Sequence, residues 1–175
     1  MTSKQRQILQ ALCCELGVPA DYGKVPYLAT YPEATELAEA GQNIVGRMQT
    51  LTPATLSGWH AMQAAAGEDD VRLLLVSGFR SYTYQAGLIR NKLDAGQTID
   101  EILKVNAAPG YSQHHTGRAI DIATPGNKPL QEEFENSPAF AWLSEHAARF
   151  GFTLSYPRDN PQGVIYEPWH WYQAD

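Results

Sequence analysis

The chain has 175 residues, which is enough for one domain with a hydrophobic core and too few for two domains of ordinary size. Hydrophobic residues make up 43% and charged residues 18%, a composition that is typical of globular proteins and excludes a disordered chain. The formal net charge of −6 argues against nucleic acid or an anionic membrane as the main partner, because both select a basic surface.

The N-terminal part of the chain is predicted to be mainly helical. Apolar residues recur at helical spacing over residues 4–16. A weaker helical pattern covers residues 32–48, where two glycines are unfavourable inside a helix. A third helix is predicted over residues 52–67, because a capping threonine followed by proline is a common helix start. We therefore interpret residues 1–50 as a helical extension of a single domain that covers residues 1–175.

The middle of the chain combines a buried strand with two helices. An apolar run at residues 71–76 predicts a strand in the interior of a sheet. Helices are predicted next, over residues 81–95 and 98–105. Residues 107–116 are expected to form a loop, and residues 118–122 alternate polar and apolar side chains, as a strand with one buried face does.

The C-terminal part is predicted to hold one more helix, over residues 137–150, and several short strands. The strand candidates are residues 152–155, 164–166 and 169–173. An order of helices, one strand, helices and then several strands is typical of the α+β class. We expect helices packed on one face of a small, mostly antiparallel sheet.

Two segments that lie far apart hold the residue types of a catalytic metal site. His114 and Asp121 are seven positions apart, in the predicted loop and on the strand after it, and His170 lies on a later strand. Two histidines and one aspartate are a ligand set of catalytic zinc, which leaves a fourth position for water. Glu167 is not needed as a ligand and is therefore available as a general base. The pattern predicts one Zn²⁺ per chain.

The other histidines and the cysteines are assigned ordinary roles. His115 directly follows the first predicted ligand and points away from it if the segment is extended, so we expect it on the surface or beside the ligands. His60 and His146 fall within predicted helices, far in sequence from the cluster. The two cysteines are adjacent in sequence and are expected to be free thiols, because neighbours rarely bridge each other.

These motifs resemble those of a known family, the VanY-type D-alanyl-D-alanine carboxypeptidases. The family belongs to a wider group with lysostaphin-like enzymes, D-Ala-D-Ala dipeptidases and the hedgehog signalling domain. Its zinc signature is similar to the pattern Ser112-x-His114-x-x-Gly117-x-Ala119-x-Asp121 followed by Glu167-x-x-His170. Its upstream motif is similar to the segment Ser77-Gly78-Phe79-Arg80-Ser81-x-x-x-Gln85.

The resemblance implies a hedgehog/D-Ala-D-Ala peptidase-like fold, zinc bound by the two histidines and the aspartate, and Glu167 as the catalytic base. It also implies that Arg80 binds substrate or stabilises the oxyanion. Gln85 and Ser112 are expected to help hold the peptide. Taken alone, Arg80 is more simply interpreted as a surface ion pair, but its place directly after a buried strand favours a cleft.

The activity that the resemblance implies is zinc-dependent removal of the terminal D-Ala from peptidoglycan stem peptides. Three alternatives use the same site: a D,D-dipeptidase, an L,D-carboxypeptidase and a peptidoglycan endopeptidase. A metal-stabilised peptide-binding module without catalysis is disfavoured, because a purely structural zinc needs no base and usually has four protein ligands.

The expected partner is a peptidoglycan stem peptide or another peptide that ends in D-Ala. No apolar run approaches the roughly 18 residues of a membrane span. The first residues also lead into no apolar segment of a signal peptide. We therefore expect a cytoplasmic location, with a periplasmic or cell-wall location as the alternative. The chain is expected to be a monomer.

Overall fold

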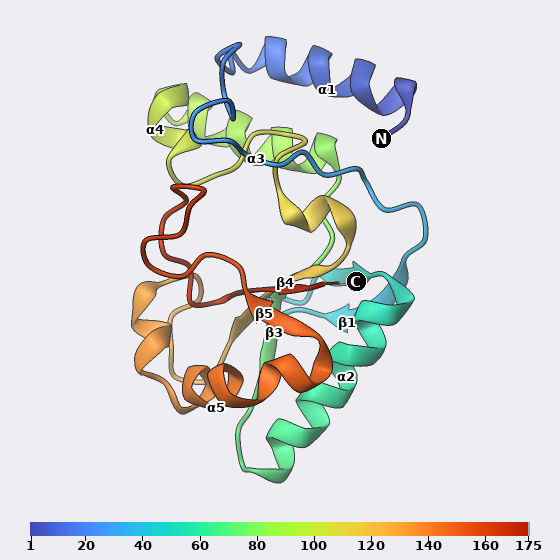
Figure 1. The fold of residues 1–175 in the computed structure, drawn as a ribbon, viewed down its shortest axis with the longest axis vertical. Helices are drawn as coiled ribbons and strands as arrows, with labels where there is room; N and C mark the ends of the chain where they lie inside the picture. Colours follow the sequence, from blue (N-terminus) through green and yellow to red (C-terminus); the bar gives the residue numbers. More distant parts are fainter. Residues whose placement is uncertain (175) are drawn as a thin grey trace.

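Four short strands form the central sheet of the structure, a computed structural model that describes residues 1–174 (Figure 1). In spatial order they are β3 (Leu74–Ser77), β4 (Ala119–Ala123), β6 (His170–Gln173) and β5 (Phe152–Leu154). Every neighbouring pair in this sheet is antiparallel. The α+β class and the mostly antiparallel sheet are confirmed.

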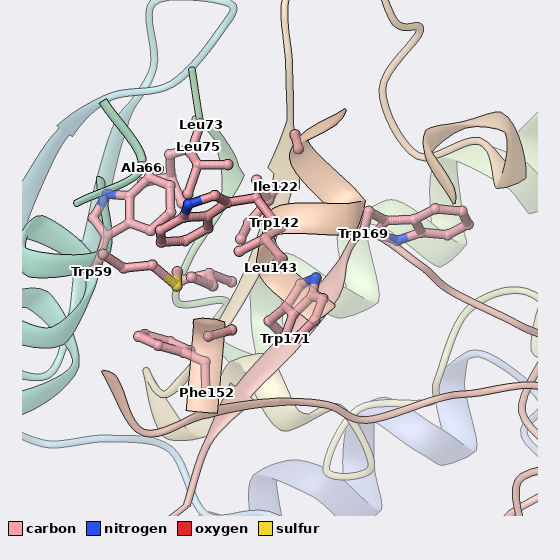
Figure 2. Packing of buried hydrophobic residues seen from close by; sticks show 14 of the residues in the cluster. Trp59, Ala66, Leu73, Leu75, Ile122, Trp142, Leu143, Phe152, Trp169 and Trp171 are labelled. Carbon is pink, nitrogen blue, oxygen red and sulfur yellow. The ribbon is translucent and has the colours of Figure 1, made fainter. Parts of the chain in front are cut away.

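The hydrophobic core lies on one face of this sheet. Ile120 and Ile122 of β4 point into it, and the helices α2 (Pro53–Glu68) and α5 (Pro138–His146) cover it. Figure 2 shows Ile122 close to tryptophan side chains from both helices and from β6. Because side chains alternate along a strand, Asp121 points to the opposite face. The register of β4 therefore separates a packed apolar face from a face that carries polar groups.

A second apolar cluster lies at the other end of the molecule (Figure 1). It joins α1 (Ser3–Glu15), α3 (Tyr82–Asp94) and α4 (Ile99–Leu103), and its buried members are Leu16, Ala86, Ile89 and Ile102. The helices predicted over residues 4–16, 81–95 and 98–105 are thus confirmed, with ends that differ by at most two residues.

Three short 3₁₀ helices complete the helical elements of the described chain. They are η1 (Gln113–Thr116), η2 (Glu132–Asn136) and η3 (Ala147–Phe150). The helix predicted over residues 137–150 is formed by α5 and η3 together, and η1 occupies the end of the predicted 107–116 loop. None of the helices within residues 1–174 is long and apolar enough to cross a membrane.

The helix predicted over residues 32–48 is wrong, and so is a wholly helical extension over residues 1–50. An antiparallel pair forms there instead, made of β1 (Ala38–Gln42) and β2 (Met48–Leu51). Gly41 and Gly46 have φ values of +86° and +75°. A helix interior does not accept this left-handed conformation, which glycine adopts without strain.

The turn between β1 and β2 is closed by the side chain of Asn43. Its carboxamide oxygen accepts hydrogen bonds from the backbone N–H groups of Val45 and Arg47, at 3.1 and 3.0 Å. Its Nδ2 donates to the carbonyl of Val76 on β3, at 2.8 Å. One asparagine therefore both shapes the hairpin and attaches it to the central sheet.

The strand predicted over residues 164–166 does not form either. The backbone N–H of Val164 donates to Oδ1 of Asn160, and its carbonyl accepts from Nδ2 of the same side chain, at 3.2 and 2.7 Å. Because a side chain satisfies both backbone groups, Val164 has no need of a sheet partner. The segment instead runs as an irregular loop up to β6.

Candidate metal centre

Three side chains from three different elements meet on the polar face of the central sheet. They are His114 from η1, Asp121 from β4 and His170 from β6, and all three are buried. Each offers one possible ligand atom, and these atoms lie within 4.8 Å of one another. Asp121 and His170 are directly opposite each other in the β4–β6 register, which places both side chains on the same face.

The short helix η1 aims His114 at this point. Ser112 caps η1 by accepting a hydrogen bond from the backbone N–H of His114, at 3.4 Å. Gly117 ends it at a φ of +66°, and a Cβ there would lie 2.9 Å from the side chain of Leu37. Glycine is thus favoured at position 117, because other residues rarely adopt this φ and an added Cβ would require Leu37 to shift.

The two ring nitrogens of His114 have different surroundings. Nδ1 donates to the carbonyl of Gly78, in the turn after β3, at 2.7 Å. Nε2 lies 3.2 Å from Oδ2 of Asp121 and makes no hydrogen bond to any residue of the described chain. Burial, together with the nearby guanidinium of Arg80, lowers the pKa of His114 to about 4. At neutral pH, His114 therefore presents an unused lone pair on Nε2.

Asp121 is the centre of the cluster. Its Oδ1 lies 3.0 Å from Nδ1 of His170, and its Oδ2 accepts from the guanidinium of Arg80 at 3.1 Å. Burial by itself raises the pKa of this carboxyl, but His114, His170 and Arg80 outweigh burial and hold the pKa well below its usual value. Asp121 is therefore ionised at neutral pH.

Arg80 and Gln85 lie together beside the aspartate. Nη1 of Arg80 donates to Oε1 of Gln85 at 3.3 Å, and Nε2 of Gln85 donates to the carbonyl of Ala107 at 2.8 Å. Nε of Arg80 is buried and has no hydrogen-bond partner within residues 1–174. The guanidinium is thus fixed at one side and retains a free donor.

Glu167 lies at the edge of the cluster. Its Oε2 is 3.8 Å from Nδ1 of His170, and its side chain is 17% exposed. Burial raises its pKa to about 7, and the charge of Asp121 acts in the same direction, whereas the charges of His170 and Arg80 oppose the rise. A carboxyl whose pKa lies near neutrality can both accept and release a proton there.

The structure thus brings all seven candidate residues of the sequence into one region. Five of them surround a common point, and the other two lie buried beside them. Arg80, Glu167 and the three predicted ligands surround a common point. Gln85 and Ser112 are buried, at 1% and 6% exposure, and their side chains are occupied by hydrogen bonds to their neighbours.

His115 does not lie on the surface, which corrects one of the two placements expected for it. Its exposure is 0%, its Nδ1 donates to the carbonyl of Arg80 at 2.6 Å, and its Nε2 accepts from the backbone N–H of Gly110 at 3.0 Å. The 3₁₀ conformation of η1 turns it inward, whereas an extended segment would have turned it outward.

Sequence reasoning missed two further residues around His170. Oε1 of Gln113 accepts from Nε2 of His170 at 2.8 Å, and the ring of Tyr156 lies 4.9 Å from the His170 ring at an interplanar angle of 33°. Gln113 directly precedes the predicted ligand His114 in the sequence, and this position could have indicated that Gln113 lies near the cluster. Tyr156 lies in a loop whose path the sequence pattern does not indicate.

Comparison with known proteins assigns the region around this cluster to a family. Residues 48–174 match the family model described as VanY, D-alanyl-D-alanine carboxypeptidase. A D-alanyl-D-alanine carboxypeptidase of Enterococcus faecalis is 32% identical over 117 residues, which cover 61% of this chain and 42% of the relative. Across four curated relatives, the matched part spans between 19% and 65% of their length.

Two solved structures extend the likeness to the fold. The LD-carboxypeptidase LdcB has a TM-score of 0.72 and 27% identity, with 81% of this chain and 69% of that chain covered. A variant of the VanY D,D-pentapeptidase from a VanB-type resistance cassette, solved in complex with Zn(II), has a TM-score of 0.64 and 26% identity, with 86% and 84% covered.

Proposed function

Because this chain belongs to the VanY family of D-alanyl-D-alanine carboxypeptidases, we propose that it is a zinc-dependent D,D-carboxypeptidase that removes the terminal D-Ala from peptidoglycan stem peptides. The observation that carries the proposal is the buried lone pair on Nε2 of His114, which faces Asp121 without a hydrogen bond. A buried polar atom without a partner is unfavourable unless a ligand satisfies it.

The donor set fits zinc. Nε2 of His114, a carboxylate oxygen of Asp121 and Nδ1 of His170 supply two nitrogens and one oxygen, as in zinc sites with three protein ligands. His114 is neutral and Asp121 ionised, which are the protonation states that metal binding requires. Zinc bound there supplies a coordinated water whose pKa is about 7 and polarises the scissile carbonyl.

Glu167 supplies the proton transfers in this proposal. Its carboxylate accepts a proton from the attacking water as the new C–O bond forms at the scissile carbonyl. It then delivers that proton to the leaving amine of D-Ala as the C–N bond breaks. A pKa near 7 suits both steps, because the same group must be a base first and an acid afterwards.

Arg80 holds the charged part of the substrate. Its side chain is 16% exposed, and its Nη2 donates to Oδ2 of Asp121 beside the predicted metal ligands. A permanently charged guanidinium can bind the terminal carboxylate of the peptide or the oxyanion that develops at the carbonyl. Gln85 supports this role by fixing Nη1 of Arg80.

L,D-carboxypeptidase activity is the second candidate. The likeness to LdcB, at a TM-score of 0.72 against 0.64 for the zinc-bound VanY variant, favours it. The two activities share the chemistry of the metal and of the base, and they differ in the residue that precedes the scissile bond. The D,D-dipeptidase and endopeptidase alternatives use the same site, and a relative from Enterococcus gallinarum that is 32% identical over 129 residues is described as both a D-Ala-D-Ala dipeptidase and a carboxypeptidase.

A paired substrate assay tests the proposal. Zinc-loaded protein is incubated with a stem pentapeptide that ends in D-Ala-D-Ala and, separately, with the tetrapeptide that ends after one D-Ala. We expect D-Ala to be released from the pentapeptide and the tetrapeptide to accumulate. Release from the tetrapeptide alone would replace the proposal with the L,D activity, and release from neither would remove the carboxypeptidase function.

The pH dependence of kcat/KM should show the ionisation of Glu167. Only the ionised carboxylate accepts a proton, so activity is expected to rise with pH and level off above the pKa of Glu167. That pKa is about 7 in the metal-free protein, and a bound cation nearby favours the ionised form. The rising limb should therefore have its midpoint at or below pH 7, and activity that falls steadily from pH 5 to 8 would contradict this role.

Two further expectations accompany this function. We propose that residues 1–175 act as one domain, since Gln5 of α1 donates to the carbonyl of Glu33 and Tyr82 contacts the same segment. A cytoplasmic, monomeric state stays a prediction. Fractionation of cells and sedimentation of the purified protein test it.

A further inference from the structure

The ring of His170 has an acceptor at each of its two nitrogens. Nδ1 faces Oδ1 of Asp121 at 3.0 Å, and Nε2 faces Oε1 of Gln113 at 2.8 Å. An imidazole that binds a metal through Nδ1 must carry its proton on Nε2, and the group that accepts this proton fixes the tautomer. The contact between Nε2 of His170 and Gln113 therefore affects metal binding through His170. Any inference from this contact rests on the zinc site of the proposed function.

We propose that Gln113 is a positioning residue for the metal centre, because its side-chain oxygen holds the Nε2 proton of His170 and keeps Nδ1 free for zinc. Gln113 is the first residue of η1, directly before His114. One short helix thus supplies one metal ligand and the hydrogen-bond partner of another. A change in the orientation of η1 would disturb two of the three ligands together.

The ring of His170 is also enclosed by two other rings and is buried in the protein. The ring of His114 lies edge-on to it at 4.9 Å, and the ring of Tyr156 lies at 4.9 Å and is tilted by 33°. His170 is 3% exposed, so water has little access to its ring. If zinc binds to Nδ1, the proton of His170 must be carried by Nε2, and Gln113 is the acceptor that faces Nε2.

Gln113 is itself held by a segment outside the family match. Its Nε2 lies 3.5 Å from the hydroxyl of Tyr31, and the family model begins at residue 48. The backbone of Tyr31 is anchored at both of its groups: its N–H donates to the carbonyl of Gly110 at 2.7 Å, and its carbonyl accepts from the hydroxyl of Tyr82 at 2.8 Å. The N-terminal segment thus supports the metal centre through Gln113.

Zinc affinity, measured by competition with a chromophoric chelator, tests the proposal without reference to hydrolysis. Gln113→Leu keeps the size of the side chain and removes the acceptor, so zinc affinity should fall about 10- to 100-fold, as the loss of such partners typically causes. Gln113→Glu keeps an acceptor at the same reach and should bind zinc at least as tightly as the wild type. A Gln113→Leu protein within threefold of the wild type would overturn the proposal.

The wild type offers a second measurement that does not depend on the folding of a variant. In the zinc-loaded protein, the Nε2 proton of His170 should give a slowly exchanging NMR signal coupled to the ring nitrogen. Detection of the proton on Nδ1 instead would overturn the proposal. If zinc binds as expected and no D-Ala is released, the proposed function fails while the role of Gln113 stands; if the wild type binds no zinc, both fail.

Discussion

Replacing Glu167 with glutamine is expected to lower kcat for D-Ala release by about 10³-fold while zinc remains bound. The substitution keeps the shape of the side chain and removes its ability to accept a proton, and general bases typically contribute 10²- to 10⁴-fold. The measurement is single-turnover release of D-Ala from the pentapeptide, with the zinc content of each sample determined in parallel. Glu145→Gln on α5 is the matched control, because its side chain is 79% exposed, and it should retain full activity.

The same variant should make the metal-free protein more stable at neutral pH. The pKa of Glu167 rises from 4.5 to about 7 on folding, so the folded state disfavours the carboxylate, and stability is lost as pH rises from 4.5 through 7. Glu167→Gln removes this penalty, which amounts to at most about 3 kcal/mol at pH 8. The two proteins should converge in stability below pH 4.5. Full activity, or a loss of stability at pH 8, would contradict the assignment of Glu167 as a buried base.

Replacing His114 with alanine is expected to abolish tight zinc binding, and activity with it. One of three protein ligands is lost, so zinc affinity should fall by more than the roughly 10- to 100-fold that an outer hydrogen-bond partner provides. Competition with a chelator gives the affinity, and circular dichroism shows whether the variant folds.

His60→Ala is the control for that experiment, since His60 is exposed on α2, outside the cluster. It should match the wild type in both zinc affinity and D-Ala release. Zinc binding by the His114 variant at wild-type strength would place the metal elsewhere in the chain.

The position of Asp121 in the cluster could be predicted from the sequence, because residue type and strand register agree along β4. Because side chains alternate along a strand, Ile120 and Ile122 share the apolar face and Asp121 lies on the opposite one. The pairing of Asp121 with His170 depends on which strands become neighbours, and the sequence pattern does not determine that. The family motif supplied this information, because it already joined the two segments.

The hairpin of β1 and β2 shows why the N-terminal part could not be predicted. Apolar residues in this segment are spaced as in a helix, but the positive φ angles of Gly41 and Gly46 and the turn held by Asn43 favour a hairpin. Side-chain hydrogen bonds of this kind depend on geometry that periodicity does not record. The burial of His115 was missed for a related reason, since one turn of 3₁₀ helix changes the direction of each side chain.

In the proposed metal centre, three side chains bind one zinc ion and leave a position for water next to Glu167. A crystal structure of the zinc-loaded protein, with anomalous data collected at the zinc edge, tests it most directly. We predict one zinc at roughly 2.0–2.2 Å from Nε2 of His114, a carboxylate oxygen of Asp121 and Nδ1 of His170, with solvent as the remaining ligand. A fourth protein ligand, or zinc bound away from these three residues, would contradict the account.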